Sequence, residues 1–360
     1  MKITYISLYY RKDRVTGANK RFDEVGQLLQ SIHGADLSVV VTDGNQPAWI
    51  DRAQVKTFSS FQTLLQRMLV YVKLTLWLLF QPKSIVYTDF MPVPILGLRK
   101  HSHYQLIHDL RSFTKFSRSV VGKLSSFAQT LELRLCENIV CVSEFTKKEL
   151  IELCGISKEK IVVSYNGVHD FKITKDVNKN LKRDLDVLYV ATFEERKNHI
   201  ALIKALGIIN KPLKVVLIGR DLGLRDFVLA EAKFVSERVE GLEIEFIDSV
   251  SEADLERYYL RSNVFVSPAL YEGFGMPVIE GMNYGCKVAC SDIEVFREVA
   301  AEAASYFDPG DPKSIAIEIQ NQLESGNRPS LANASNIKRF HWGSIAQTLN
   351  DRFQDSWKKI

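Results

Sequence analysis

Short hydrophobic runs alternate along the chain with longer segments in which apolar residues recur every three to four positions. The short runs are rich in Val, Ile, Leu and Tyr, as β-strands are, and the longer segments have the period of amphipathic helices. This alternation predicts βαβ units and parallel sheets. The predicted strands fall into two sets: residues 2–10, 37–43, 84–89, 104–110, 138–144 and 161–167, then residues 186–193, 213–219, 242–248, 263–270, 287–292 and 305–308.

The two sets of strands are separated by a polar stretch, residues 172–184, that has the composition of a linker. The chain of 360 residues also exceeds the size at which a single hydrophobic core usually stops growing. We therefore predict an α/β protein with two Rossmann-like domains joined near residue 170. Because ligands of open parallel sheets bind beyond the carboxyl ends of the strands, we expect a site in a cleft between the domains, among the loops that follow strands.

One apolar segment, residues 64–80, is too short to be a typical membrane span. It contains Arg67 and Lys73 and ends before Pro82, whereas a spanning helix needs about 20 apolar residues. We expect a buried or interfacial helix, with core packing as the main cause of its hydrophobicity. An apolar helix beside a basic patch is also how peripheral proteins bind anionic bilayers, so a membrane surface stays open as a partner.

The composition is that of an ordinary globular protein, 46% hydrophobic and 25% charged. Its five cysteines include no C-x-x-C pair, which indicates reduced intracellular thiols rather than a disulfide framework or a metal site. The N-terminus lacks the succession of segments of a signal peptide. These features predict a cytoplasmic location.

The charge is distributed unevenly. Residues 1–170 contain 22 Lys and Arg against 15 Asp and Glu, while residues 171–360 contain 25 against 28. A basic half indicates an acidic partner, although a solvated surface explains such a run equally well. One cluster of cations is opposed only by Asp109: Arg99, Lys100, Arg111, Lys115, Arg118 and Lys123.

Two carboxylates, Glu272 and Glu280, lie eight positions apart around a glycine-rich bend. Pro277 suits the first position of a helix, which would place Glu280 in the first turn. Gly273 and Gly275 let the backbone approach a ligand, and the helix N-terminus favours an anion such as phosphate. Glu280 would then accept hydrogen bonds from a diol such as ribose; the alternative is that it only complements the helix dipole.

A second loop adds positive charge. Arg196 and Lys197 follow the first strand of the second set, where two cations would neutralise a diphosphate and stabilise it as a leaving group. A solvated helix start is the alternative explanation for these two residues. Asp184 and Asp186 form a D-x-D pattern, but they precede a strand, so we interpret them as structural.

The E-x7-E of Glu272 and Glu280, within SPALYEGFGMPVIEGMNYG, resembles the signature of retaining glycosyltransferases of the GT-B fold, family 4. Further segments are similar to that family: ERKN (195–198), residues 250–268, YNGV (165–168) and FHW (340–342). The resemblance covers nearly all of residues 138–353. It implies an acceptor-binding domain at 1–170, a domain that binds the nucleotide sugar at 171–340, and a C-terminal helix at 341–360 that packs back on the first domain.

The resemblance also implies roles for individual residues. Gly17 stands where the family has a glycine-rich loop near the donor diphosphate, and His108, in LIHDLR, matches a histidine beside the transferred sugar. Thr192 and His169 depart from the family pattern. The implied catalytic residues are Glu272, His108, Arg196 and Lys197, and the implied donor-binding residues are Gly17, Arg196, Lys197, Gly273, Phe274, Gly275 and Glu280.

The activity that the resemblance implies is retaining transfer of a hexose from a nucleotide diphosphate sugar, with GDP-mannose or a UDP-sugar favoured. The acceptor would be a lipid-linked oligosaccharide or polysaccharide in the synthesis of an O-antigen or capsule, at the inner face of the cell membrane. Neither a metal, another cofactor nor a nucleic acid is implied. A GT-B-fold epimerase and a non-catalytic scaffold that binds sugar nucleotides remain as alternatives, whereas the absence of G-x-G-x-x-G after the first strand argues against an oxidoreductase.

Overall fold

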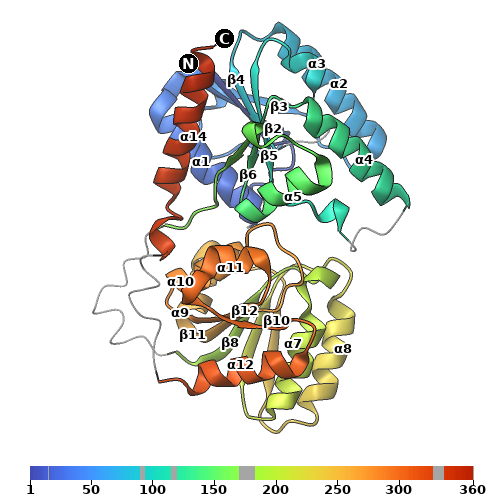
Figure 1. Ribbon diagram of the computed structural model, residues 1–360, viewed down its shortest axis with the longest axis vertical. Helices are drawn as coiled ribbons and strands as arrows, with labels where there is room; N and C mark the ends of the chain where they lie inside the picture. The colour runs from blue at the N-terminus through green and yellow to red at the C-terminus, as the bar shows by residue number, and fades with distance from the viewer. Residues whose placement is uncertain (15, 90–93, 115–119, 170–182, 327–335, 360) are drawn as a thin grey trace. The chain divides into compact units, whose positions relative to one another are not determined.

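The computed structural model describes residues 1–14, 16–89, 94–114, 120–169, 183–326 and 336–359, with only the backbone for 120–125. The chain divides into two compact units, Met1–Gly167 with Trp342–Ile360, and Val168–His341. Each unit is a parallel sheet with helices on both faces (Figure 1). Most of the predicted linker, together with Lys115, Arg118 and the side chain of Lys123, lies outside the described residues.

The first unit contains a seven-stranded parallel sheet in the order β3-β2-β1-β4-β5-β6-β7. From β1 the chain adds β2 and β3 on one side of the sheet, and from β4 it adds β5, β6 and β7 on the other. The strand order therefore reverses between β1 and β4. The strands are β1 (Ile3–Ile6), β2 (Leu37–Thr42), β3 (Val55–Phe58), β4 (Ile85–Thr88), β5 (Ser102–Ile107), β6 (Asn138–Cys141) and β7 (Ile161–Val163).

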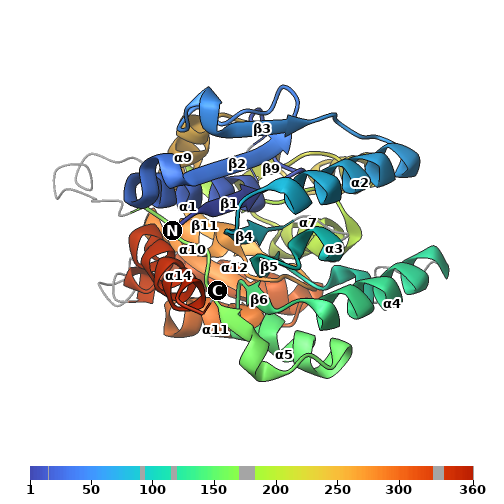
Figure 2. The same ribbon diagram turned by 90° about the horizontal axis from the view of Figure 1, so that it is seen from above.

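Two groups of helices cover the two faces of this sheet (Figure 2). One face is covered by α1 (Gly17–His33) and α14 (Trp342–Trp357), which contact each other. The other is covered by α2 (Leu64–Phe80), α3 (Ile95–Leu98), α4 (Val120–Leu135) and α5 (Glu144–Cys154). Short 3-10 turns connect elements in both units: η1 (Gly34–Asp36), η2 (Arg52–Gln54), η3 (Arg111–Phe113), η4 (Lys158–Lys160), η5 (Glu195–Lys197) and η6 (Ala301–Ala303).

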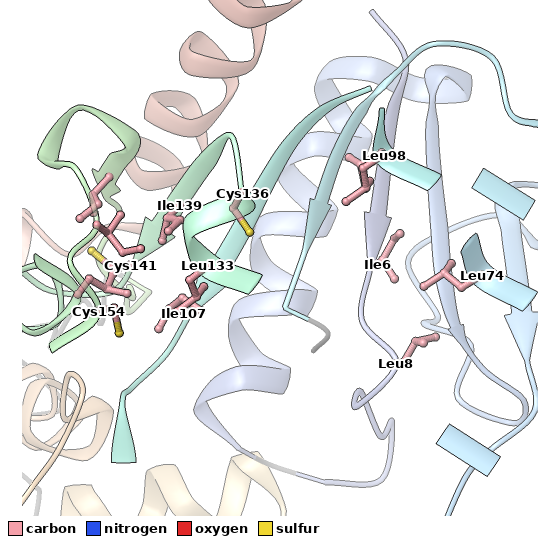
Figure 3. Close-up of a cluster of buried hydrophobic side chains, with 14 of the residues drawn as sticks. Ile6, Leu8, Leu74, Leu98, Ile107, Leu133, Cys136, Ile139, Cys141 and Cys154 are labelled. Atoms are coloured by element: carbon pink, nitrogen blue, oxygen red, sulfur yellow. The ribbon is translucent and has the colours of Figure 1, made fainter. Parts of the chain in front are cut away.

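The two faces of the first sheet have different cores because side chains alternate along each strand. Ile6 and Ile107 point to the α2–α5 side, where they join a buried aliphatic cluster that includes Leu74 (Figure 3). The opposite face is aromatic, and Tyr87 packs there on the ring of Phe353 from α14 at 5.6 Å. The five cysteines of the chain are all free and buried.

The second unit repeats the same topology in a six-stranded parallel sheet, with the order β10-β9-β8-β11-β12-β13. The strand order reverses between β8 and β11, which pair directly. The strands are β8 (Leu185–Val190), β9 (Lys214–Ile218), β10 (Glu243–Ile247), β11 (Ser262–Ser267), β12 (Lys287–Ser291) and β13 (Ser305–Phe307).

Helices cover both faces of the second sheet (Figure 1). On one face α12 (Pro312–Glu324) packs on α7 (His199–Ile209), and α7 packs on α8 (Arg225–Ser236). On the other face lie α9 (Glu252–Arg261), α10 (Met276–Asn283) and α11 (Glu294–Ala300). This arrangement leaves the carboxyl ends of β8 and β11 free to present their loops side by side.

All twelve predicted strands are present, although each ends earlier than predicted. The sequence pattern missed β3, which lies at the edge of its sheet and exposes Lys56 and Thr57, so it lacks a hydrophobic run. The apolar segment 64–80 forms α2, beginning at a capping box of Thr63 and Gln66. Within the part of the chain that the structure describes, no helix is long and apolar enough to cross a membrane.

Candidate active site

The loops after β8 and β11 bring together residues that are about 75 positions apart in the sequence. The loop after β8 contains η5 with Arg196 and Lys197, and the loop after β11 contains Glu272. Their meeting follows from the topology, because β8 and β11 are adjacent parallel strands at the point where strand order reverses. A backbone hydrogen bond from Leu270 N to the carbonyl of Arg196, 2.8 Å long, joins the two loops.

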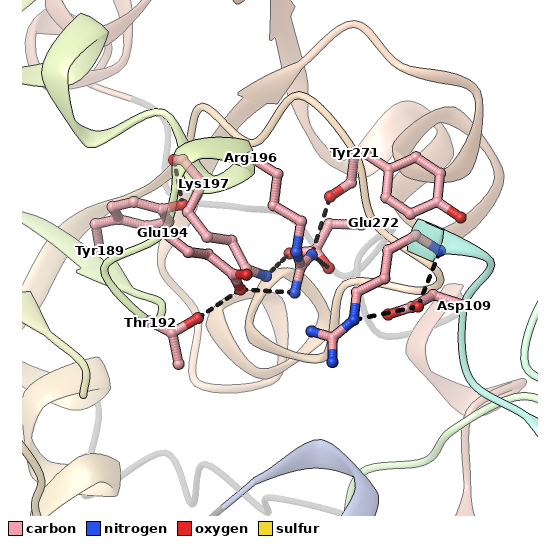
Figure 4. A network of polar contacts seen from close by, with 9 residues as sticks. Asp109, Tyr189, Thr192, Glu194, Arg196, Lys197, Tyr271 and Glu272 are labelled. Atoms are coloured by element: carbon pink, nitrogen blue, oxygen red, sulfur yellow. Dashed lines mark hydrogen bonds and ion pairs between the residues drawn. The ribbon is translucent and has the colours of Figure 1, made fainter. Parts of the chain in front are cut away.

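Glu272 is paired with both predicted cations (Figure 4). Arg196 Nη1 lies 3.0 Å from Glu272 Oε2, and Lys197 Nζ donates to Glu272 Oε1. Arg196 also lies 2.9 Å from Glu194 Oε1, which accepts a hydrogen bond of 2.8 Å from Thr192. The side chains of Arg196, Lys197 and Glu272 are only 10%, 11% and 14% exposed, so they form a largely buried charge network.

The network controls the protonation of Glu272. Burial alone would raise the pKa of its carboxyl, but the charges and hydrogen bonds of Lys197 and Arg196 outweigh burial and hold that pKa below its ordinary value. Glu272 is therefore ionised at neutral pH. Two cations balance two carboxylates here, so an anionic group that enters would exchange for a carboxylate as partner of Arg196 and Lys197.

The backbone around the cations is fixed by two residues that were not among the predicted site residues. Asn198 adopts a left-handed conformation with a φ of 58° and donates to the carbonyls of Pro268 and Pro309. The hydroxyl of Tyr189, in β8, donates to the carbonyl of Lys197 at 2.7 Å. An asparagine after a polar turn is the sequence signal that could have indicated this conformation.

Glycine is required at the start of α10. Gly275 has a φ of 96°, and a Cβ atom there would lie 2.6 Å from the ring of Phe296. The helix begins with Met276, so Pro277 is its second residue and Glu280 its fifth. The prediction that Glu280 lies in the first turn was wrong, because the left-handed cap at Gly275 starts the helix one residue before Pro277.

Glu280 lies in the second turn of α10 and is 8% exposed. Its Oε2 accepts a hydrogen bond of 3.0 Å from the hydroxyl of Tyr259, in α9. Tyr259 stacks on Tyr284 with a ring separation of 5.5 Å. Burial, followed by the charge of Glu280, raises the pKa of Tyr259 well above its ordinary value, so the phenol remains a hydrogen-bond donor. Tyr259 was not among the predicted site residues, because it has no motif of its own.

Phe274 has its side chain in the core of the second unit. It is 3% exposed, and its ring packs edge-on against Phe340 at 5.5 Å. A role for Phe274 in donor binding therefore rests on its backbone, as it does for Gly273. Asp184 and Asp186 lie at the amino end of β8, where Asp184 pairs with Arg261 at 2.8 Å and Asp186 accepts from the backbone N–H of Lys214.

Two candidate residues, Gly17 and His108, belong to the first unit. Gly17 is the first residue of α1, after a cap in which the Thr16 side chain accepts from the backbone of Asn19. His108 follows β5, and its Nε2 is buried without a hydrogen-bond partner among the described residues. Burial, and then the charge of Arg21, lower the pKa of His108 to about 3, so its imidazole is neutral.

Two family models match adjoining parts of the chain. Residues 15–170 match the model of Glycosyltransferase Family 4, and residues 170–339 match that of Glycosyl transferases group 1. Two curated relatives are an O-antigen chain mannosyltransferase B of Escherichia coli, 27% identical over 76% of this chain and 75% of its own, and the O-antigen chain mannosyltransferase RfbU of Salmonella typhimurium, 26% identical over 77% and 75%.

Solved structures show the same fold over the whole chain. Sucrose-phosphate synthase from Thermosynechococcus elongatus aligns with a TM-score of 0.78 at 18% identity, covering 100% of both chains. HepE of Anabaena, solved with UDP and glucose, aligns with a TM-score of 0.77 at 16% identity, covering 98% of this chain and 99% of its own.

The two doubly wound parallel sheets and the alignments with solved structures show that the chain has the GT-B fold. The chain belongs to glycosyltransferase family 4, whose members are retaining. The predictions of the α/β GT-B fold, of the family and of glycosyltransferase activity are thus confirmed.

Proposed function

We propose that this glycosyltransferase transfers mannose from GDP-mannose to a lipid-linked glycan in the synthesis of an O-antigen. The observation that supports a diphosphate donor best is the network of Arg196, Lys197 and Glu272 after β8 and β11. Mannose is favoured because both relatives described above are O-antigen mannosyltransferases. Gly17, His108 and the acceptor belong to the first unit in this proposal, and the donor binds to the second.

In the proposed reaction the bond between the sugar and the diphosphate breaks, and the departing phosphate gains negative charge. The acceptor hydroxyl forms the new bond to the same anomeric carbon, and its proton passes to an oxygen of the departing phosphate. Arg196 and Lys197 stabilise that charge, assisted by the N-terminus of α10 and the backbone of Gly273 and Gly275. Glu272, ionised and released from the cations by the diphosphate, faces the developing positive charge of the sugar ring. Glu280, held by Tyr259, accepts hydrogen bonds from the ribose.

Thermal unfolding with GDP, UDP and ADP, with and without EDTA, tests the donor site. A nucleotide present at 100 times its dissociation constant should stabilise the protein by about 2.7 kcal/mol. We expect GDP to give this shift in the wild type and a smaller one in Glu280→Gln. A shift with UDP alone would refute GDP-mannose as donor, and no shift with any nucleotide would refute the donor site.

An anionic membrane surface is the second part of the proposal, and α2 supports it. Unlike a helix buried in a core, α2 has one face that exposes large apolar side chains: Leu64, Leu65, Met68, Leu69, Val72, Leu76, Leu79 and Phe80. Beside it, α3 exposes Leu96, and α4, which covers the same face of the sheet (Figure 2), exposes Phe127, Leu131 and Leu135. We call these residues the α2–α4 apolar face.

The charge around this face matches anionic lipid. Between Asp51 and Asp109 the chain has seven Lys and Arg residues and a single acid, Asp89. Cations beside an exposed apolar helix are the combination that holds peripheral proteins at anionic bilayers. The expected location is therefore the inner face of the cell membrane, where lipid-linked acceptors are available.

Co-sedimentation with vesicles tests this part. We expect binding to phosphatidylglycerol-containing vesicles, weakening as salt rises, and little binding to pure phosphatidylcholine. The variant Leu65→Gln/Phe80→Gln should bind less, whereas Ile317→Gln, which changes an exposed apolar residue in the second unit, should bind like the wild type. Equal sedimentation of all three proteins would refute the α2–α4 apolar face as the binding surface.

A further inference from the structure

The carboxyl edge of the first sheet contains a half-buried acid, Asp89, that lies in no motif. Asp89 follows β4, and Ser7 follows β1, the neighbouring strand. Ser7 Oγ donates to Asp89 Oδ2 at 2.9 Å, so one oxygen of the carboxyl is held in place. These two residues lie where the strand order of the first sheet reverses, which is the position at which open α/β sheets bind ligands.

The other oxygen of Asp89 has no hydrogen-bond partner in the part of the chain that the structure describes. Oδ1 is buried and accepts no hydrogen bond within the described residues. The nearby cation does not fill this role, because the guanidinium of Arg21 donates to the hydroxyl of Tyr87 and to groups of residues 164–166. Leaving a carboxylate oxygen buried and unpaired costs free energy, and that cost is removed if a ligand donates to it.

A second unpaired group follows the next strand. β5 runs beside β4 with Thr88 opposite Gln105, so His108 and Asp89 both follow adjacent strand ends. Nε2 of His108 is also buried without a partner among the described residues, and its imidazole is neutral. A carboxylate oxygen that accepts and a neutral imidazole nitrogen together suit neighbouring sugar hydroxyls, each of which donates and accepts.

We propose that Asp89, oriented by Ser7, binds a hydroxyl of a hexose through Oδ1 and is a further substrate-binding residue of the transfer reaction. The inference rests on the proposed function and adds to it a residue in the first unit. The hexose is the sugar of the donor or the sugar of the acceptor, since both present the same hydroxyl chemistry. A structural carboxylate, satisfied only by water, is the competing explanation.

The test compares Asp89→Asn and Ser7→Ala with Asp43→Asn, which changes an exposed aspartate after β2. Each protein is assayed with GDP-mannose for hydrolysis and for transfer to octyl α-mannoside, and its stabilisation by GDP alone is measured. We expect Asp89→Asn to lose about 10-fold to 100-fold in kcat/KM, the range of one hydrogen bond to a charged group. Ser7→Ala should lose less, and Asp43→Asn should equal the wild type.

The two reactions distinguish the two sugars. Equal losses in hydrolysis and transfer assign the hydroxyl to the donor, and a loss in transfer alone assigns it to the acceptor. GDP stabilisation should be the same in all the proteins, because Asp89 contacts no part of the nucleotide in this proposal. Rates of Asp89→Asn within twofold of an active wild type overturn the inference alone, whereas a wild type inactive with GDP-mannose and with UDP-hexoses overturns the proposed function and the inference together.

Discussion

The substitution Glu272→Gln tests the charge network directly, because it removes one charge and keeps the shape of the side chain. Arg196 and Lys197 then remain in a site where both are about nine-tenths buried. Removing one partner of a buried ion pair typically costs about 3–5 kcal/mol. Arg196 still has the carboxylate of Glu194 at 2.9 Å as a partner. We therefore expect a loss in the free energy of unfolding at the lower end of this range, about 3 kcal/mol.

The assay is thermal unfolding of the protein at pH 7, in which the second unit contains the altered network. For a unit of this size, 1 kcal/mol changes Tm by about 2–4 °C, so Glu272→Gln should lower Tm by about 6–12 °C. The control is Asp292→Asn, which breaks an ion pair with Arg297 of similar length, 2.7 Å, in which both side chains are about half exposed. Exposed pairs contribute about 0–1 kcal/mol, so the control should change Tm by less than about 4 °C.

The pH dependence of stability and the stabilisation by GDP test the same charge network in two further ways. Because the folded pKa of Glu272 is lowered, its contribution is present above the unfolded pKa of about 4.3 and is lost as pH falls through the folded value. The difference between wild type and Glu272→Gln should therefore be constant from pH 7 to about pH 5 and shrink below about 4.3. GDP should stabilise the variant more than the wild type, because its diphosphate replaces the missing charge. A variant that matches Asp292→Asn in Tm would refute the buried network.

Three further substitutions test other parts of the structure. Burial raises the pKa of Asp89 from 3.8 to about 6 in the folded protein. Protonated Asp89 therefore stabilises the fold fully below about pH 3.8, and this contribution is lost as the pH rises through 6. Asp89→Asn should be more stable than the wild type by up to about 3 kcal/mol in urea unfolding at pH 7.5, and equally stable near pH 3.8. Gly275→Ala should lose about 2–4 kcal/mol in the same measurement, from its left-handed backbone and the clash with Phe296, and an unchanged midpoint would contradict this geometry. Tyr259→Phe should lose about 1.5–3 kcal/mol and bind GDP several-fold more weakly in titration calorimetry, because Glu280 loses the donor that orients it; unaltered GDP affinity would separate Tyr259 from the donor site.

The order of strands and helices was predictable from the sequence because a strand covered on both faces is a continuous hydrophobic run. The runs at 84–89 and 263–270 each contain an observed strand, β4 and β11. The same rule missed β3, since an edge strand buries little. Gly275 also changed a local prediction, because a left-handed cap, and not the proline, set the helix start and moved Glu280 into the second turn.

The sequence predicted the residues of the candidate site that belong to motifs, but not how these residues pair. Arg196, Lys197 and Glu272 were selected from two separate segments, but their pairing depends on β8 and β11 being neighbours in the sheet. Tyr259 and Asp89 were not selected, since each is a common residue type in an ordinary run and acquires its partner from another element.

The sequence by itself determined the class of fold, the two sets of strands and the family, because these follow from local hydrophobic period and from short motifs. Only the tertiary structure decided which charges neutralise one another, which buried oxygens lack a partner among the described residues, and which side of α2 packs on the core. Local periodicity acts over a few residues, whereas the environment of a side chain depends on strands and helices that are distant in sequence and adjacent in space. The same apolar or charged residue therefore has a different role according to what the fold places beside it.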